Sequence, residues 1–478
     1  SPKKTFFRVN ILKADKTQVI RALRNYEDIE FEEAGLENFF VLKRGNISTK
    51  PEHIFGYIFI QDLSSALVTD SLWMDENFLT LDLCASAGGK TTLLASLYPS
   101  ALIIANDLGS DRISALVHNI QRMGALNCVV TQCDARFFPY VDNKEIDLIL
   151  ADVPCSAEAN LDDYENYNLE KHQKFIKYIT SLQYRILSRA VEISTKNTKI
   201  IYSTCTFNPL ENELLLDELI KEKKIKILPI QKFSEWKNFL ENISPGILKY
   251  KDYIFDESLR NTVRIYPSHT KGMFISNIVP INEIDNKKEN YQYKVNSRME
   301  IVNIDEGVDF QGYKLKRFDV EKVYEILKVF GLPFEFVTKL TWFYKDKGDK
   351  IEEIYVSSVD SFPVKKKGPL KVEYVGLKAL KFFKPLKTYK PTSSFLTLLN
   401  SYIQKNYIEL RFDIEVLKKF LRREAVSKED LIDMHVSGDY PFVAVKFNGL
   451  IIGCAVNKFQ KFYSEIPTSK ANFVLNYL

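Results

Sequence analysis

The six cysteines of this chain are scattered and form no CxxC pair, so the sequence offers no basis for a metal or disulfide framework. They lie at positions 84, 128, 133, 155, 205 and 454 of 478 residues. Zinc sites and small disulfide-stabilised domains need closely spaced cysteines. We therefore expect no metal cofactor, and we expect reduced intracellular thiols.

Long apolar runs and a strong charge of one sign are also missing. No bilayer-spanning stretch or secretory leader is visible, so we expect a soluble cytoplasmic protein, a monomer with no membrane partner. The 66 Lys and Arg residues are opposed by 62 Asp and Glu, which leaves a formal net charge of +4. Any nucleic-acid surface must then come from local basic clusters. The opening Ser1-Pro2 is typical of a trimmed terminus or a tag remnant.

The length is sufficient for about two to four hydrophobic cores. Within the C-terminal part, Asn448-Gly449 between two apolar runs predicts a β-hairpin. A polar stretch at 286–296 marks one domain boundary. Lys3, Lys4 and Arg8 beside aromatic residues make the start of the chain a candidate RNA-binding face, with an ordinary solvated surface as the alternative. The predicted regions are this N-terminal α/β module (1–75), an α/β core (76–285), a middle accessory region (286–375) and a C-terminal module (376–478).

Strands alternate with helices from about residue 76 to residue 228. A long helix is predicted over Leu169–Ser194, and apolar strands at 78–82, 101–107, 127–133, 146–152 and 199–204. This alternation predicts the α/β class: a doubly wound, Rossmann-like parallel sheet covered on both faces, followed by α+β accessory domains. Ligands bind such sheets at the carboxyl ends of the strands. The residues predicted to meet there are Cys84, Asp107, Asp134, Asp152, Cys155 and Cys205.

The first of these strands leads into a loop of small residues within FLTLDLCASAGGKT (Phe78–Thr91). A phosphate loop would need glycine where Cys84 stands, and a dinucleotide fingerprint would need three spaced glycines. An ordinary strand-to-helix turn without a ligand is the alternative. Free N–H groups at the helix start favour a ligand with electronegative atoms. The candidate contacts are Cys84, Ala85, Ser86, Ala87, Gly88, Gly89 and Lys90.

Two aspartates after later strands suit a nucleoside. Asp107 can accept hydrogen bonds from a ribose diol, and Asp134 can accept one from an adenine amino group. Capping of the following helix is the alternative role for either residue. No phosphate signature or acidic metal cluster accompanies them, so a nucleoside with a small charged tail fits best. S-adenosylmethionine is such a cofactor.

Two cysteines directly follow strands, Cys155 in Asp-Val-Pro-Cys and Cys205 in Ser-Thr-Cys-Thr. Nearby helix N-termini are expected to lower the pKa of both thiols. A thiolate that adds to carbon 6 of cytosine makes carbon 5 nucleophilic enough to take a methyl group. Asp152 is placed to hydrogen-bond the ring and stabilise the adduct. The remaining cysteines are expected to be buried (Cys128, Cys133 and Cys454) or to line the loop (Cys84).

These segments together resemble the Sun-type RNA cytosine-5 methyltransferases over about residues 1–280. The matching segments are RVNIL, YIFIQDLSS, LDLCASAGGKT, ND at 106–107, DVPCS, YSTCTFNPLENE and RIYPSHTKGMFIS. The resemblance implies that Cys205 is the nucleophile and that Cys155 promotes product release. It also implies cofactor contacts by Cys84–Lys90, Asp107, Asp134 and Asp152. Arg112 is a further cofactor-side candidate, with a surface salt bridge as its alternative.

Several positions depart from the family pattern. Ala87 stands where proline is usual, Ala157 follows Ser156 where glycine is usual, and 159–168 lacks the usual Arg-Lys. VEYVGLKALKFF and PFVAVKFNGLIIGCAV resemble the PUA-like tails of longer members, among them the bacterial small-subunit rRNA methyltransferase F branch. Lys365–Lys367 and the spaced Lys384, Lys387 and Lys390 are candidate RNA contacts, with a solvated surface as the alternative.

The sequence thus predicts an RNA cytosine-5 methyltransferase that uses S-adenosylmethionine on structured RNA. Ribosomal RNA is the favoured partner and transfer RNA the alternative. A catalytically inactive RNA-binding assembly factor is the competing hypothesis from another class. A third hypothesis makes Cys155 the attacking thiol.

Overall fold

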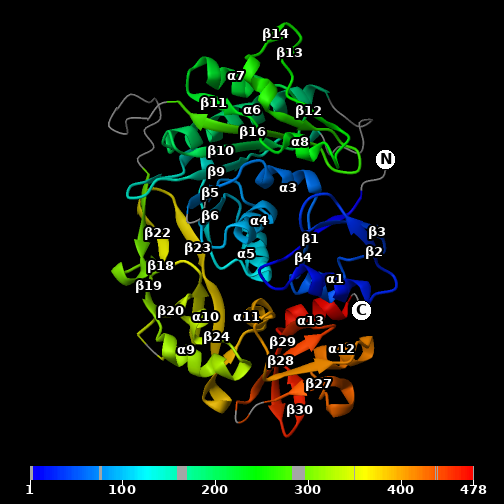
Figure 1. Ribbon diagram of the computed structural model, residues 1–478. Helices are drawn as coiled ribbons and strands as arrows, with labels where there is room; N and C mark the ends of the chain where they lie inside the picture. Colours follow the sequence, from blue (N-terminus) through cyan, green and yellow to red (C-terminus); the bar gives the residue numbers. More distant parts are fainter. Residues whose placement is uncertain are drawn as a thin grey trace.

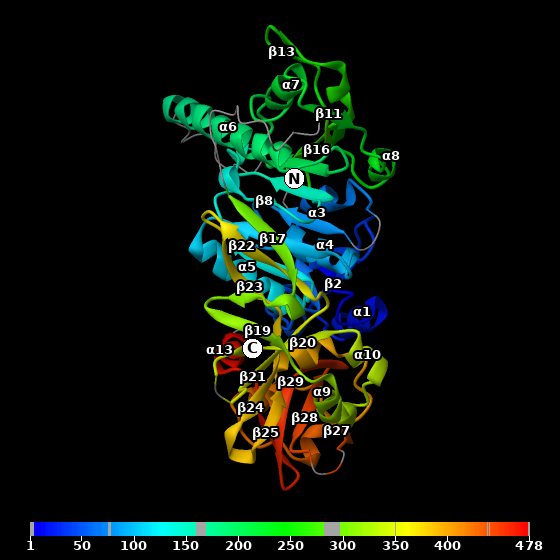
Figure 2. The same cartoon turned by 90° about the vertical axis from the view of Figure 1, so that its left-hand side faces the viewer.

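The computed structural model describes residues 4–74, 78–158, 169–281, 297–348, 350–436, 438 and 440–476. Figures 1 and 2 show an elongated molecule, with the large central sheet in the upper half and two smaller sheets below it. The predicted boundary at 286–296 and the segment 159–168 lie outside the described residues. Within the described part, no helix is long and apolar enough to cross a membrane.

The centre of the sheet consists of the parallel strands that the alternation predicts. Five strands run parallel in the order β10-β9-β5-β6-β7. From β5 the chain adds β6 and β7 on one side, and it then returns to the other side of β5 to add β9 and β10. A crevice for a ligand forms where strand order reverses in this way. The strands are β5 Leu79–Asp82, β6 Leu102–Asp107, β7 Cys128–Gln132, β9 Leu148–Asp152 and β10 Lys199–Thr204.

Antiparallel strands extend the sheet on both sides, so the complete sheet is mixed rather than wholly parallel. Beyond β10 lie β16 Met273–Pro280, β15 Val263–Ile265 and β12 Ile243–Pro245, and β11 Ile225–Leu228 also pairs with β16. At the other edge, β23 Lys371–Val375 pairs with β7. β13 Lys249–Tyr250 and β14 Tyr253–Ile254 form a separate hairpin.

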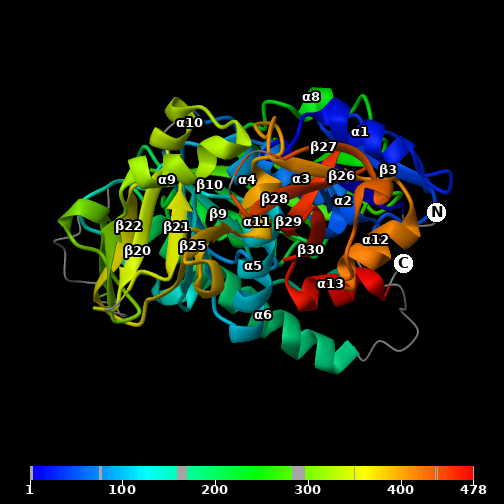
Figure 3. The ribbon, with the colours of Figure 1, turned by 90° about the horizontal axis from the view of Figure 1, so that it is seen from below.

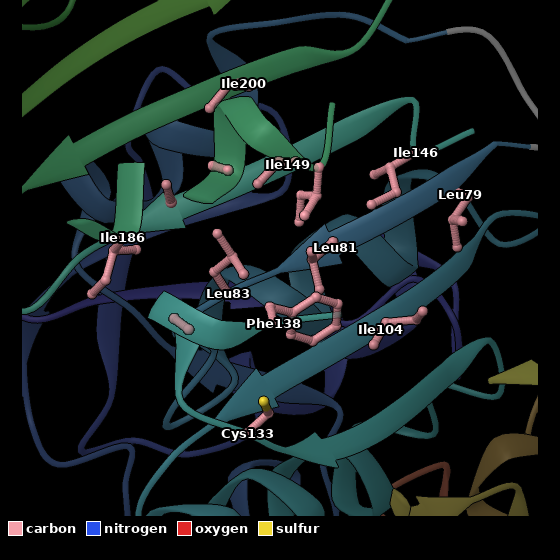
Figure 4. Packing of buried hydrophobic residues seen from close by; sticks show 14 of the residues in the cluster. Leu79, Leu81, Leu83, Ile104, Cys133, Phe138, Ile146, Ile149, Ile186 and Ile200 are labelled. Atoms are coloured by element: carbon pink, nitrogen blue, oxygen red, sulfur yellow. The ribbon is translucent and has the colours of Figure 1, made fainter. Parts of the chain in front are cut away.

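Helices cover both faces of the sheet because alternate strand residues point to opposite sides. Ile104 packs in the cluster that contains α6 and α7, whereas Ile103 packs with α3, α4 and α5. Figure 4 shows the first cluster, with Leu81 of β5 beside Phe138. The helices are α3 Leu63–Asp70, α4 Gly89–Leu97, α5 Ser110–Met123, α6 Leu169–Glu192, α7 Glu213–Lys221 and α8 Phe233–Trp236. Cys128, Cys133 and Cys454 are buried, as predicted.

The N-terminal module and the last sheet of the chain share one hydrophobic core. Phe7 and Phe40 pack in the same cluster as Val443 and Leu450. Helix α1 contacts β29 of the last sheet accordingly. The N-terminal elements, in sheet order β2-β3-β1-β4, are β1 Phe6–Val9, β2 Glu30–Glu33, β3 Phe39–Arg44, β4 Ile58–Ile60, α1 Lys16–Arg24 and α2 Pro51–Ile54. The last sheet, in order β27-β26-β28-β29-β30, has β26 Tyr407–Leu410, β27 Leu431–His435, β28 Phe442–Phe447, β29 Leu450–Lys458 and β30 Lys461–Ser464, with α11 Ser393–Leu398, α12 Ile414–Leu421 and α13 Thr468–Leu475.

The middle region forms a six-stranded sheet in the order β18-β19-β20-β21-β24-β25. Seen from below in Figure 3, this sheet lies beside the five-stranded sheet, and α11 packs against β24 of one and β29 of the other. Its elements are β18 Asp309–Phe310, β19 Tyr313–Arg317, β20 Thr341–Asp346, β21 Glu353–Ser357, β24 Leu377–Phe383, β25 Thr388–Pro391, α9 Val320–Leu327 and α10 Phe334–Thr338. A small sheet joins β22 Ser361–Lys367 and β17 Arg298–Asn303 to β8 Tyr140–Val141 of the core.

The predicted division after residue 375 therefore cuts through one sheet, because β24 pairs with β21 on the other side of it. Similarly, β23 belongs to the central sheet although it lies in the predicted middle region. Hydrophobic patterning shows that a strand exists but not which distant strand it pairs with. The four-region division itself stays a prediction.

Lys13 connects three parts of the chain at their common junction. Its Nζ donates to the carbonyl oxygens of Phe55 and Arg122, at 2.7 and 2.6 Å, and to Thr397 Oγ1 at 2.8 Å. Burial, together with the charges of Lys470 and Arg122, lowers the pKa of Lys13 well below its usual value. Three directed hydrogen bonds thus satisfy the buried Lys13 side chain, and they tie the N-terminal module to α5 and α11.

The predicted Asn448-Gly449 hairpin is confirmed, and it also forms part of the module interface. Both residues have positive φ, 57° and 77°, as a tight two-residue β-turn requires. Asn448 Nδ2 donates to Ala22 O at 2.8 Å and to Glu52 Oε1 at 2.9 Å, and its Oδ1 accepts from Asn25 Nδ2 at 2.7 Å. One side chain thus completes a turn and joins the two ends of the chain.

We expect Asn448→Gly to lower the free energy of unfolding by about 1–3 kcal/mol, because buried partners lose their hydrogen bonds while the turn keeps a residue suited to positive φ. Asn448→Ala should lower it further, since alanine also resists that backbone conformation. Chemical denaturation of the two variants separates the interface effect from the turn effect. Equal stability of Asn448→Gly and wild type would contradict a role of this contact in holding the modules together.

Candidate active site

A cavity of about 470 Å³ lies at the carboxyl ends of the central strands. It sits beside β5 and β9, where the strand order reverses, as doubly wound folds predict. The N-terminal module forms one wall and the segment before β16 another. The lining residues are Phe59, Ile60, Gln61, Asp62, Ser64, Ser65, Asp82, Cys84, Ala85, Ser86, Ala87, Gly89, Lys90, Asp152, Val153, Cys205, Lys271, Gly272 and Met273.

The loop between β5 and α4 has little room for side chains on its inner side. Gly88 has φ 92°, and an added Cβ would come within 3.0 Å of Leu116 Cδ1 on α5. Asn106 fixes the start of the loop by donating from Nδ2 to Leu83 O and Cys133 O, at 3.0 and 2.9 Å. The ND pair at 106–107 thus positions the loop from the neighbouring strand.

Asp107 reaches the same loop from the end of β6. Its Oδ2 accepts from Ser86 N at 3.1 Å and from Arg112 Nη2 at 2.9 Å, while Oδ1 accepts from Leu108 N at 2.7 Å and Gly109 N at 3.2 Å. Arg112 is half exposed and forms the salt bridge named as its alternative role. Asp107 therefore organises the loop, and its contact with a ribose stays a prediction.

Asp134 lies beyond the cavity lining, after β7. It caps a short 3₁₀ turn by accepting from Arg136 N at 3.0 Å, and it also binds the guanidinium of Arg136. Burial opposes ionisation of Asp134, but these hydrogen bonds outweigh it and lower the pKa of the carboxyl. Asp134 therefore acts as a helix cap in this structure, and its contact with adenine stays a prediction.

The two catalytic candidates among the cysteines meet directly. Cys155 Sγ and Cys205 Sγ are 2.7 Å apart, and Cys205 N donates to Cys155 Sγ at 3.2 Å. The thiol hydrogen bond and burial raise the pKa of Cys155. The bond from Cys155 lowers the pKa of Cys205, with burial and Asp152 opposing and Lys90 assisting. The expectation that both thiols have a lowered pKa is thus wrong for Cys155, because one proton shared between two sulfurs stabilises only one thiolate.

Asp152 sits between the cysteine pair and the loop. Its Oδ2 accepts from Lys90 Nζ at 2.7 Å, and its Oδ1 accepts from Ser203 Oγ at 2.6 Å. Ser203 is the register partner of Asp152 on β10. This pairing aims the carboxylate into the cavity and places the ammonium of Lys90 where it favours a thiolate at Cys205.

Two residues that sequence reasoning missed, Gln61 and Asp82, carry buried polar atoms at the cavity. Gln61 Oε1 accepts from Arg8 Nε at 2.8 Å, and Asp82 Oδ2 accepts from Thr91 Oγ1 at 2.7 Å. Among the described residues, Gln61 Nε2 and Asp82 Oδ1 have no partner. Burial raises the pKa of Asp82 to about 7. A donor and an acceptor thus remain for a ligand with both a carboxylate and an ammonium group, and this fits the amino-acid end of S-adenosylmethionine.

No signal in the sequence distinguished Gln61, because it reaches the cavity only through the docking of the N-terminal module. Asp82, by contrast, ends a predicted strand and could have been included on that ground. Across the described residues, no group of three or more His, Cys, Asp or Glu side chains is arranged to hold a metal ion.

We expect Cys205 to react with iodoacetamide at lower pH than Cys155 or Cys84. Above its pKa the thiol is ionised, so a lowered pKa moves the onset of alkylation to lower pH, and a raised one moves it higher. Burial raises the pKa of Cys84 as well. Mass spectrometry of single-site alkylation across pH 6 to about 10 measures this order. Earlier reaction of Cys155 would instead support the hypothesis that Cys155 attacks.

Comparison with known proteins identifies relatives of the core. Residues 71–279 match the family model described as 16S rRNA methyltransferase RsmB/F. Ribosomal RNA small subunit methyltransferase F of Shewanella amazonensis is 34% identical over 224 residues, which cover 44% of this chain and 47% of that protein. The tRNA (cytosine(49)-C(5))-methyltransferase of Pyrococcus abyssi is 28% identical over 288 residues, which cover 58% of this chain and 88% of that protein.

Human 28S rRNA (cytosine(4447)-C(5))-methyltransferase is 30% identical over 256 residues, but the chain spans only 30% of its length. The next relatives, from mouse and Schizosaccharomyces pombe, are spanned over 28% and 47% of their lengths. The solved structure of a methyltransferase homolog protein from Pyrococcus horikoshii is 26% identical with a TM-score of 0.50, and covers 58% of this chain and 87% of its own. This likeness confirms the predicted fold of the core. Residues 71–279, less than half of the chain, are therefore similar to the 16S rRNA methyltransferase RsmB/F family.

Proposed function

We propose that this protein is an S-adenosylmethionine-dependent RNA (cytosine-5-)-methyltransferase that acts on a cytosine in structured RNA. The observation that carries the proposal is the contact between Cys205 and Cys155 beside a cavity with room for a cofactor. Cys205 is the nucleophile, and its hydrogen bond with Cys155 lowers its pKa. The names of the relatives, all cytosine-C5 or ribosomal RNA methyltransferases, support the same chemistry.

The cofactor would be held by the small-residue loop Cys84–Lys90, with Asp107 and Arg112 on its nucleoside side and Asp134 near the base. Gln61 and Asp82 would hold its amino-acid end, and Asp152 would face its reactive group. When bound, S-adenosylmethionine supplies an electrophilic methyl group. The loop keeps its backbone open to such a ligand because its side chains are small.

The reaction would begin with the Cys205 thiolate, which adds to carbon 6 of the cytosine and saturates the 5,6 bond. Asp152 would accept a hydrogen bond from the exocyclic amine and, in its protonated form, give its proton to ring N3, which neutralises the negative charge that thiolate addition places on the ring. After methyl transfer, a base would take the carbon 5 proton, the Cys205 sulfur would leave as a thiolate, and N3 would return its proton to Asp152, which restores the aromatic ring. Cys155, one hydrogen bond away, is placed to assist that departure.

RNA would have to present the cytosine unstacked, because a base inside a helix cannot enter the cavity. The N-terminal module would guide it, since that module forms one cavity wall through Phe59 and Gln61. Among the candidate RNA-binding lysines, Lys366, Lys384 and Lys390 already pair with Glu300, Glu352 and Glu465. We therefore assign the larger share of phosphate contact to the exposed Lys365, Lys367 and Lys387.

Ribosomal RNA is the favoured substrate, since the family model and several relatives carry that name, and transfer RNA is the alternative. Mapping of methylated cytosines in cells with and without the protein separates the two. An inactive RNA-binding assembly factor is disfavoured, because binding alone gives no reason for a shared proton between two cysteines at the cavity.

We expect Cys205→Ala to abolish methyl transfer from labelled S-adenosylmethionine to RNA, and Cys155→Ala to accumulate a covalent RNA–protein adduct. The first variant loses the attacking sulfur, whereas the second retains it but loses the group that assists its departure. Denaturing gels with labelled RNA detect the adduct. An adduct in Cys205→Ala would exchange the roles of the two cysteines. Wild-type protein that binds RNA without transferring methyl would support the assembly-factor hypothesis.

We expect Gln61→Glu to weaken binding of S-adenosylmethionine by about tenfold or more, because a hydrogen bond to a charged group is replaced by repulsion. This variant is well matched, since the new carboxylate still accepts from Arg8 and should preserve the fold. Calorimetric titration of the cofactor, without RNA, measures the change. Unaltered affinity in a variant with an unaltered melting temperature would remove Gln61 from the cofactor site.

A further inference from the structure

Two buried side chains, one on α6 and one at the end of the loop that begins with Cys205, hold the peptide groups on either side of Cys155. Gln183 Nε2 donates to Pro154 O, before the cysteine, at 2.8 Å. Glu211 Oε2 accepts from Ser156 N, after the cysteine, at 3.0 Å. Gln183 Nε2 also donates to Glu211 Oε2 at 2.8 Å, so the two side chains form one unit. Both are fully buried.

This Gln183–Glu211 clamp connects three separate elements. Gln183 lies on α6, and Glu211 precedes α7. The backbone oxygen of Glu211 accepts from Tyr202 Oη, at 2.6 Å, on the strand that ends next to Cys205. The clamp therefore fixes the Cys155 loop with respect to β10, and not merely with respect to its own strand.

A second tie joins the residues that follow the two cysteines. Ser156 Oγ donates to Thr206 Oγ1 at 2.9 Å. Together with the clamp, this bond leaves the Cys155 loop little freedom to move away from the Cys205 loop. Neither Gln183 nor Glu211 lines the cavity, so neither is a candidate for contact with the cofactor.

We propose that Gln183 and Glu211 are positioning residues, which hold the Cys155 sulfur within hydrogen-bond distance of the Cys205 sulfur. Their role in catalysis rests on the proposed function, whereas their effect on the cysteine pair does not. The physical reason is distance, since a hydrogen bond between two sulfurs weakens rapidly when one loop shifts.

The charges around the cysteine pair make this contact necessary. Lys90 favours the thiolate at Cys205, whereas Asp152 and burial oppose it. The hydrogen bond from Cys155 lowers the pKa of Cys205 more than any other interaction. Burial raises the pKa of Glu211, against the hydrogen bonds from Ser156 and Gln183, and Glu158 acts in the same direction as burial. The clamp can persist without a charge on Glu211, because a protonated carboxyl keeps an oxygen that can accept from Ser156 and Gln183.

The test compares Gln183→Leu, which removes the donor and keeps the volume, with Glu211→Gln, whose amide oxygen can still accept from both partners. We expect the alkylation midpoint of Cys205 in the free protein to move to higher pH in Gln183→Leu and to stay near wild type in Glu211→Gln. The turnover of Gln183→Leu should fall on the order of a hundredfold, with little change in cofactor affinity or in KM for RNA. Ser188→Ala, also on α6, removes a buried hydroxyl that has no partner in the described part of the chain and is the matched control.

An unchanged Cys205 midpoint in folded Gln183→Leu would overturn the proposal. Complete loss of activity in Glu211→Gln with a wild-type midpoint would also overturn it, because Glu211 would then act as an acid or base rather than as a positioning residue. If wild-type protein transfers no methyl to any RNA, the proposed function fails. The midpoint comparison still decides whether the clamp holds the cysteines.

Discussion

The contact between Cys155 and Cys205 depends on the register of two neighbouring parallel strands. β9 and β10 pair so that Ser203 lies opposite Asp152, which brings the loops after both strands to one point. A shift by one residue would turn every side chain of one strand to the other face. Leu148, Leu150 and Ile201 pack on one face of the sheet and Ile149 and Ile200 on the other, so such a shift would repack both hydrophobic clusters. Hydrophobic packing far from the chemistry thus determines where the two sulfurs lie.

Around that contact, the site is assembled by residues that fix one another. Asn106 and Asp107 hold the small-residue loop, and Lys90 at the start of α4 reaches back to Asp152. The two members of this ion pair act in opposite directions on the pKa of Cys205, because the Lys90 ammonium favours the thiolate and the Asp152 carboxylate opposes it. A hydrogen bond from the second cysteine tips this balance. In the proposed reaction, the second cysteine therefore has an electrostatic role in addition to its role in product release.

The cavity also depends on the way the chain closes on itself. The N-terminal module contributes Gln61 and Phe59 to the cavity wall and shares its core with the last sheet. Lys13 and Asn448 make directed bonds across these junctions. The C-terminal region consequently supports the N-terminal module, which forms this wall of the cavity, although the region lies far from the cavity in sequence. This arrangement gives the accessory regions a structural task in addition to any contact with RNA.

The sequence by itself determined the five parallel strands, the loop Cys84–Lys90, the Asn448-Gly449 turn and the burial of Cys128, Cys133 and Cys454, because each depends on local patterning. It also pointed to Cys155 and Cys205 as a pair. Only the tertiary structure decided that the pKa values of these two cysteines move in opposite directions and that Gln61 reaches the cavity. It also decided that β23 joins the central sheet whereas β24 joins the six-stranded sheet. These features arise from contacts between segments distant in the chain, and neither periodicity nor spacing records which distant segments meet.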